Sequence, residues 1–331
     1  MIIKIFKSNN PAAVFLVPMV TAIFWFTGFL FGNPTSNSPD FGFYFYQVIN
    51  DFFAENRLLE IFTGIVLVST QAILLNRIFN QNDFYERNIF LPSLLYIVLM
   101  SSAPNSYFVS PLIIGNTFLI IGFSYIYQLR RQIDAKNTIF KTAFYMGLAS
   151  CFYPPYALYI VTVFAALLII RPFVFREYIL SILGFLIPWC YLLSFTYINK
   201  GGIYLEFFNE IQFNSSLNLT YFESYLYIKM LMISFLGIIL LHGFFTWLQS
   251  LQLSSLRFKR LNQLNISFFI LGFILSLLEL FIIDINFNIL VLALPLTLIL
   301  PFGLTEAKNK TFPSFLWYIF IISILINTYY S

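Results

Sequence analysis

Long apolar runs, separated by short polar stretches, make up most of this sequence. A helix needs about 20 apolar residues to cross the hydrocarbon core of a bilayer, and its backbone must satisfy its own hydrogen bonds there. The pattern therefore predicts an all-α, polytopic transmembrane bundle in a single domain covering residues 1–331. We expect about eleven spans, at 13–31, 58–78, 89–102, 110–127, 138–153, 155–171, 177–198, 228–249, 265–283, 287–304 and 313–330.

Two of these runs, 89–102 and 138–153, are short and turn quickly into the next run. Pro, Ser and Asn residues mark the turns at 101–106 and 151–155, as is typical of chain reversals. Short hairpins of this kind are expected to be tilted or to stop below the outer surface, which would leave a cavity above them. The alternative is that the short runs are not separate spans.

Two longer polar segments, 32–57 and 199–227, interrupt the apolar pattern. Apolar side chains recur at helical spacing over 45–53 in the first segment and over 204–211 in the second, with polar and acidic side chains on the opposite face. Helices with these two faces lie in the plane of the membrane interface. We therefore predict one interfacial amphipathic helix in each segment.

The distribution of Lys and Arg predicts the orientation of the bundle. If the N-terminus lies in the cytoplasm and eleven spans follow, 15 of the 18 basic residues fall in cytoplasmic segments. The other three, on the outer side, are Arg57, Lys200 and Lys229. Basic residues concentrate on the cytoplasmic side of membrane proteins, so we expect the N-terminus inside, the C-terminus outside and both polar segments outside.

The composition excludes a water-soluble protein and argues against a nucleic-acid partner. Charged residues make up 10% of the chain and hydrophobic residues 60%, whereas soluble domains carry about 25% charged residues. The net charge of +4 is spread through loops and forms no basic patch, so binding to nucleic acid is not expected. A membrane lipid is the expected partner, and the sequence indicates no particular protein partner.

Motifs for well-known chemistries are absent from the sequence. There is no phosphate-binding loop, dinucleotide fingerprint, nucleophile elbow or metal-spaced set of His and Cys residues, so no cofactor and no metal are expected. Ionisable residues within spans are candidates for function. His242 either has such a role or bonds a neighbouring helix. Glu279 and Asp284, at the outer end of their span, either face a cavity or lie at the interface.

Asp40 stands out in the first outer segment because it precedes an aromatic run and the predicted interfacial helix. It follows Ser38 and Pro39, which is the context of a turn or a helix-capping residue. A structural role is therefore one interpretation, and a role in catalysis is the other.

The architecture of roughly residues 1–230 resembles the integral-membrane glycosyltransferases of the C-type fold. The shared features are a first span, a long outer segment with an early acid and membrane-lying helices, and then short spans in pairs. The stretch Gly147–Ser150 before the turn at Pro154 and Pro155, followed by an apolar span ending at Arg171, is similar in style to those enzymes.

This resemblance implies a function for the outer segment. Asp40 would act as general base on the acceptor, and the donor would be a polyprenyl-phosphate-linked sugar. The donor phosphate requires positive charge on the outer side, which Arg57, Lys200 and Lys229 supply. Many such enzymes carry two acids at this place, whereas Asp40 is alone, and this departure leaves its role open.

The N-terminal stretch Ile5–Pro11 leads straight into the first span. It is similar to the start of an uncharacterised family of bacterial polytopic inner-membrane proteins. That resemblance implies a multi-pass protein of the bacterial inner membrane and no particular activity.

Three functions therefore remain open. The first is a glycosyltransferase-like enzyme that uses a polyprenyl-phosphate-linked sugar at the outer face of the inner membrane. The second is a transporter or lipid flippase, which requires a polar path through the bundle; the discriminating observation is whether Glu279, Asp284 and His242 point into one cavity or into lipid. The third is a non-enzymatic subunit of a membrane complex, which the lack of a strong motif favours.

Overall fold

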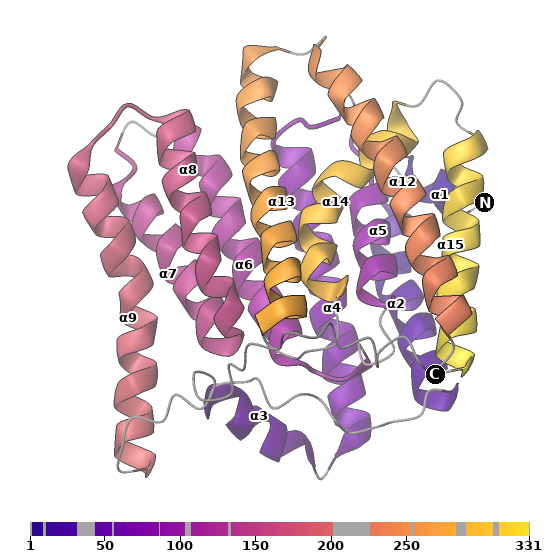
Figure 1. Ribbon diagram of the computed structural model, residues 1–331, viewed down its shortest axis with the longest axis horizontal. Helices are drawn as coiled ribbons and strands as arrows, with labels where there is room; N and C mark the ends of the chain where they lie inside the picture. Colours follow the sequence, from indigo (N-terminus) through magenta and orange to yellow (C-terminus); the bar gives the residue numbers. More distant parts are fainter. Residues whose placement is uncertain are drawn as a thin grey trace.

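The chain folds into a bundle of helices (Figure 1). The computed structural model describes residues 2–8, 11–31, 44–54, 56–85, 87–102, 107–131, 134–200, 226–252, 255–282, 289–306 and 311–330. Every regular element within these ranges is a helix, so the prediction of an all-α protein is confirmed.

Each of the eleven predicted runs overlaps one α-helix of the structure. In chain order these helices are α2 (Ala12–Phe31), α4 (Arg57–Gln81), α5 (Leu91–Met100), α6 (Pro111–Gln128), α7 (Lys136–Phe152), α8 (Ile160–Ile170), α9 (Phe175–Lys200), α12 (Leu226–Gln252), α13 (Leu256–Ile282), α14 (Ile289–Thr305) and α15 (Thr311–Tyr330). The remaining described elements are α1 (Ile2–Phe6), α3 (Tyr44–Ala54) and the 3₁₀ helices η2 (Leu129–Arg131) and η3 (Pro154–Tyr159).

Several of these helices have the length and composition of membrane spans. In the part of the chain that the structure describes, five are long and apolar enough to cross a membrane, namely α4, α6, α9, α12 and α13. On α4, α9, α12 and α13 the outward-facing surfaces carry large exposed apolar side chains, which is the arrangement that a lipid environment favours. The chain is therefore a helical membrane protein with several apolar helices.

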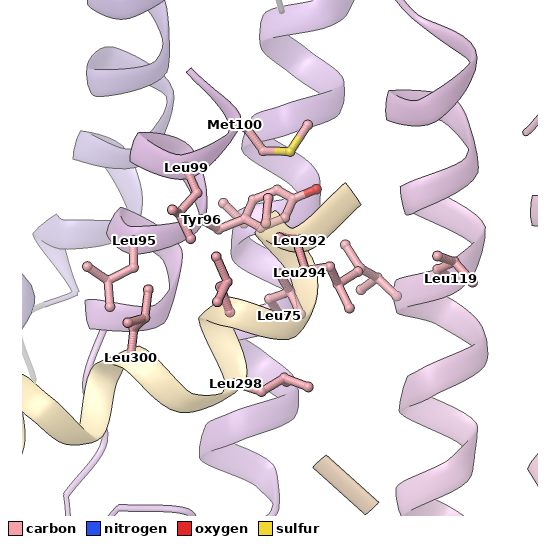
Figure 2. Packing of buried hydrophobic residues seen from close by; sticks show 14 of the residues in the cluster. Leu75, Leu95, Tyr96, Leu99, Met100, Leu119, Leu292, Leu294, Leu298 and Leu300 are labelled. Atoms are coloured by element: carbon pink, nitrogen blue, oxygen red, sulfur yellow. The ribbon is translucent and has the colours of Figure 1, made fainter. Parts of the chain in front are cut away.

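Helix α5 occupies the centre of the bundle. It has 10 residues and is buried at every one of them, so its length of about 15 Å is half the thickness of a bilayer core, about 30 Å. Figure 2 shows its side chains packed among those of α4 and α14. The predicted short run 89–102 thus forms a helix that ends inside the protein.

Helices α6 to α9 form one side of the bundle, and α12, α14 and α15 form the other together with α2 (Figure 1). Helices α4 and α13 connect the two sides, since α4 packs on α6 and on α2, and α13 packs on α8 and on α14. Helix α3 lies across the lower end of this bundle in Figure 1, beside α4, α7 and α9. This lower end is called the α3 end below.

Candidate functional site

A fully buried carboxyl group lies near the α3 end, three residues before α13 ends. The side chain of Glu279 has an exposed fraction of 0%. The hydroxyl of Tyr153 donates a hydrogen bond to its Oε1, while Oε2 has no hydrogen-bond partner. One neutral donor offsets only part of the cost of removing a carboxyl group from water. Glu279 is therefore enclosed by protein and does not lie exposed at an interface.

The chain turn after α7 places Tyr153 against Glu279. Helix α7 ends at Phe152, Tyr153 is extended with φ −129° and ψ 98°, and Pro154 begins η3. Proline suits the first turn of a helix, where its missing N–H has no intrahelical acceptor to satisfy. The two consecutive prolines thus end α7 and begin a tighter helix at once.

Three tyrosines project from this turn as one row. Residues three apart eclipse each other in a 3₁₀ helix, and Tyr153, Tyr156 and Tyr159 have this spacing. Their rings pack edge to face, with centroids 4.9 Å apart for the first pair and 5.5 Å for the second. All three side chains are buried. The repeat of Tyr at every third position was a signal that the sequence interpretation did not use.

Two sets of hydrogen-bonded polar side chains lie inside the bundle, and one of them begins at these tyrosines. The hydroxyl of Tyr156 donates to Oδ1 of Asn116 on α6 at 2.7 Å. On α5, the hydroxyl of Tyr96 donates to Oε1 of Gln71 on α4 at 2.7 Å, and Gln71 Nε2 donates to Thr117 Oγ1 at 2.7 Å. Hydrogen bonds of this kind hold helices together in an apolar environment. Polar groups from α4, α5, α6 and η3 thus meet around the core.

The helix predicted over 45–53 in the segment 32–57 is present as α3. Phe45 packs on Phe152 and Phe195, with ring centroids 6.1 and 5.7 Å apart. Val48 and Phe52, on the adjoining side of the helix, are exposed. One part of the apolar face therefore contacts the bundle beside the turn that carries Tyr153, and another part is available to lipid.

Of the site residues predicted in the outer segments, only Arg57 has a described side chain at the α3 end. Arg57 begins α4 next to α3, is exposed, and has its guanidinium 5.1 Å from the centroid of the Phe108 ring. Lys200 ends α9 and Lys229 lies in the first turn of α12, but their side chains are outside the described part of the chain. Asp40 is outside the described residues, and so is the helix predicted over 204–211.

The other ionisable candidates do not converge. His242 on α12 is half-buried, and its ring lies edge-on to that of Phe312 on α15, 6.1 Å away. Glu279 on α13 instead contacts the α7–η3 turn, and Asp284 lies outside the described residues. The arrangement of His242 and Glu279 therefore does not form one shared ionisable site.

The described residues contain no cluster of three or more His, Cys, Asp or Glu side chains that could hold a metal ion. This end of the bundle offers a buried carboxyl, a row of tyrosines, the exposed Arg57 and the amphipathic helix α3. No protein-family model, curated protein or solved structure matches this chain.

Proposed function

We propose that the chain is a multi-pass protein of the bacterial inner membrane that acts on a lipid-linked polar substrate at the α3 end. The favoured activity is glycosyl transfer from a polyprenyl-phosphate-linked sugar. The observation that carries this proposal is the position of α3, which packs on the turn from which Tyr153 reaches the buried Glu279. The accompanying topology is eleven spans with the N-terminus inside, so that this end faces outward.

The geometry suits a substrate with an apolar tail and an anionic head. The exposed Val48 and Phe52 on α3 provide apolar contacts at interface depth. Arg57 presents a guanidinium at the start of the adjoining helix, and guanidinium groups bind phosphate with two parallel hydrogen bonds. A polyprenyl phosphate carries both features in one molecule.

In the proposed reaction Asp40 is the general base. The acceptor hydroxyl gives its proton to Asp40 as its oxygen bonds to the anomeric carbon of the sugar. The bond between that carbon and the phosphate oxygen breaks, and polyprenyl phosphate leaves. Arg57, Lys200 and Lys229 stabilise the charge on the departing phosphate, and the buried Glu279–Tyr153 pair holds the turn on which α3 packs.

The test uses the full chain in liposomes that contain a radiolabelled polyprenyl-phosphate sugar and a mixture of candidate acceptors. We expect release of polyprenyl phosphate by the unaltered protein and a loss of at least about 100-fold in Asp40→Asn, as for other general bases. Asp134→Asn, at an exposed turn between η2 and α7, is the matched control and should keep full activity. Full activity in Asp40→Asn, or no binding of the lipid by the unaltered protein, would contradict the proposal.

Transport is the second candidate; buried polar groups inside the bundle favour it, although His242 and Glu279 do not converge on one site. The Tyr96–Gln71 and Tyr156–Asn116 hydrogen bonds supply polar groups at a depth where apolar side chains are the rule. The discriminating measurement is movement of a labelled lipid between the leaflets of protein-containing liposomes. Movement that Asn116→Leu abolishes and Asp40→Asn leaves intact would favour transport over transfer.

The orientation is tested with single cysteines at two exposed positions in a Cys190→Ser background. Asn56 lies at the α3 end, and Asn88 lies in the connection between α4 and α5. We expect a membrane-impermeant maleimide to label Asn56→Cys in intact cells and Asn88→Cys only after permeabilisation. The reverse result would invert the proposed topology.

A further inference from the structure

A cavity of about 290 Å³ opens on the surface at the end of the bundle remote from α3. The last turns of α4 form one wall and the segment leading into α5 forms the other. Its lining includes Ile73, Asn76, Arg77, Asn80, Asn88 and Phe90. None of these residues belongs to the site described above.

Two asparagines one helical turn apart on α4 differ in their hydrogen bonding at this cavity. Asn80 is fully engaged, since its Nδ2 donates to Ile89 O at 3.1 Å and its Oδ1 accepts from Ile89 N at 3.3 Å. Asn76 has an exposed fraction of 3%, and its Oδ1 has no hydrogen-bond partner. Leaving a buried acceptor unsatisfied is costly. Asn80 therefore shapes the cavity wall, and Asn76 lines the cavity with a buried acceptor that no described donor satisfies.

Positive charge adjoins this acceptor. The side chain of Arg77 is exposed and lines the cavity, and it forms no ion pair with any described carboxylate. The lining contains no acidic residue. A basic pocket at the end of membrane helices is suited to an anionic lipid headgroup, because a guanidinium pairs strongly with phosphate.

The approach to the cavity is apolar. Phe62 and Val66 are exposed on α4, and Thr70 and Arg77 continue the same helix face at exposed positions. Ile73 stands between this stripe and the polar lining. A lipid acyl chain lying along the stripe would place its headgroup at Arg77, whereas a free phosphate ion makes no use of the stripe.

We infer that this cavity binds an anionic phospholipid whose headgroup carries a hydroxyl. Its phosphate pairs with Arg77, its hydroxyl donates to Oδ1 of Asn76, and an acyl chain lies on the apolar stripe of α4. The inference is independent of the proposed transferase activity, because the two sites share no residue.

The test is native mass spectrometry of the full chain in detergent, titrated with phosphatidylglycerol. We expect saturable binding of one lipid, weakened at least about tenfold in Arg77→Gln, which is the size expected for loss of a charge-assisted hydrogen bond. Asn76→Leu should weaken binding several-fold, and Arg77→Lys should retain most of it. Arg87→Gln is the matched control, because Arg87 is exposed in the same connection but does not line the cavity.

Two further arms separate the ligand sources. Phosphatidylethanolamine, which has no net charge, should bind at least about tenfold more weakly than phosphatidylglycerol, and inorganic phosphate should not raise the melting temperature of the protein. Equal binding of the two lipids would overturn the inference. So would equal losses in Arg77→Gln and Arg87→Gln, or stabilisation by inorganic phosphate alone.

Discussion

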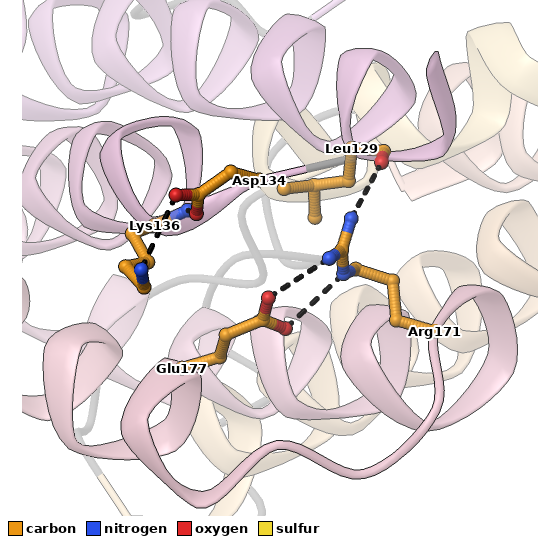
Figure 3. Close-up of polar contacts among 5 residues, drawn as sticks. All are labelled: Leu129, Asp134, Lys136, Arg171 and Glu177. Atoms are coloured by element: carbon orange, nitrogen blue, oxygen red, sulfur yellow. Dashed lines mark hydrogen bonds and ion pairs between the residues drawn. The ribbon is translucent and has the colours of Figure 1, made fainter. Parts of the chain in front are cut away.

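Arg171 and Glu177 form a two-point ion pair across the connection between α8 and α9 (Figure 3). Arg171 Nη2 lies 3.0 Å from Glu177 Oε1, and Nε donates to Oε2 at 3.1 Å. The two side chains are only 12% and 5% exposed. Arg171 Nη1 also donates to the carbonyl oxygen of Leu129 at 3.4 Å. The pair thus ties the α8–α9 connection to the end of α6.

Removing Glu177 should destabilise the protein strongly. Glu177→Ala leaves the guanidinium of Arg171 buried without its carboxylate, and breaking a buried pair on one side costs about 3–5 kcal/mol. The measurement is thermal unfolding in detergent, monitored by the fraction of protein that stays monodisperse. An unchanged melting temperature would show that water replaces the carboxylate.

The Asp134–Lys136 pair is the matched control for this ion pair. Its Nζ–Oδ2 distance of 3.2 Å is similar, but both side chains are at least half exposed. Hydrogen bonds from the backbone and side chain of Lys136 hold the pKa of Asp134 below its usual value. Any stabilisation from this carboxylate is therefore present at neutral pH and is lost as the pH falls through that pKa. Asp134→Asn should leave the melting temperature unchanged at pH 7.

Helices α7 and α9 should tolerate no side chain at their crossing. A Cβ added at Gly147 would lie 2.5 Å from the carbonyl oxygen of Phe185, and one added at Gly184 would lie 2.7 Å from that of Phe140. Each alanine substitution should cost about 1–3 kcal/mol, because the two backbones must separate. Gly237 on α12 has nothing within 4 Å of an added Cβ. Gly237→Ala should therefore be neutral or stabilising by up to about 1 kcal/mol, and equal effects at all three glycines would contradict this account.

Tyr153 should be important for stability because of its hydroxyl group. Tyr153→Phe leaves both oxygens of the Glu279 carboxyl without a donor, at a cost of about 1–3 kcal/mol. The double substitution Tyr153→Phe with Glu279→Leu should recover part of that loss, because an apolar pair leaves no unsatisfied group. Tyr145→Phe is the control, because Tyr145 lies on α7, which leads into the turn, and its hydroxyl donates no hydrogen bond to a buried carboxyl. Chemical unfolding in mixed micelles would measure all three free energies.

The two faces of α3 should differ in their access to lipid and water. Spin labels at Phe52→Cys and Asp51→Cys, in a Cys190→Ser background, report this by electron paramagnetic resonance in liposomes. Both native side chains are exposed, but Phe52 lies on the apolar side of the helix. We expect the label at position 52 to be relaxed more by oxygen, which partitions into lipid, and the label at 51 more by a water-soluble nickel complex. Identical accessibility would show that α3 does not lie in the interface.

The sequence alone predicted the approximate positions of α3 and of the eleven helices that overlap the apolar runs. An apolar run of about 20 residues in lipid must form a helix to satisfy its backbone, so each predicted run overlaps one helix of the structure. The amphipathic spacing over 45–53 likewise predicted α3, because the period of apolar side chains is a local property of the chain. The catalytic role of Asp40 and the helix expected over 204–211 stay predictions, since both lie outside the described residues.

Only the tertiary structure decided which polar groups meet. Glu279 and Tyr153 are 126 residues apart, and local periodicity contains no information about a contact over that distance. The sequence left Glu279 either facing a cavity or lying at an interface, and packing of α13 on the α7–η3 turn enclosed it. In the same way Asn76 and Asn80 have equivalent helical positions. The fold of the α4–α5 connection alone gave Asn80 its partners and left the acceptor of Asn76 open.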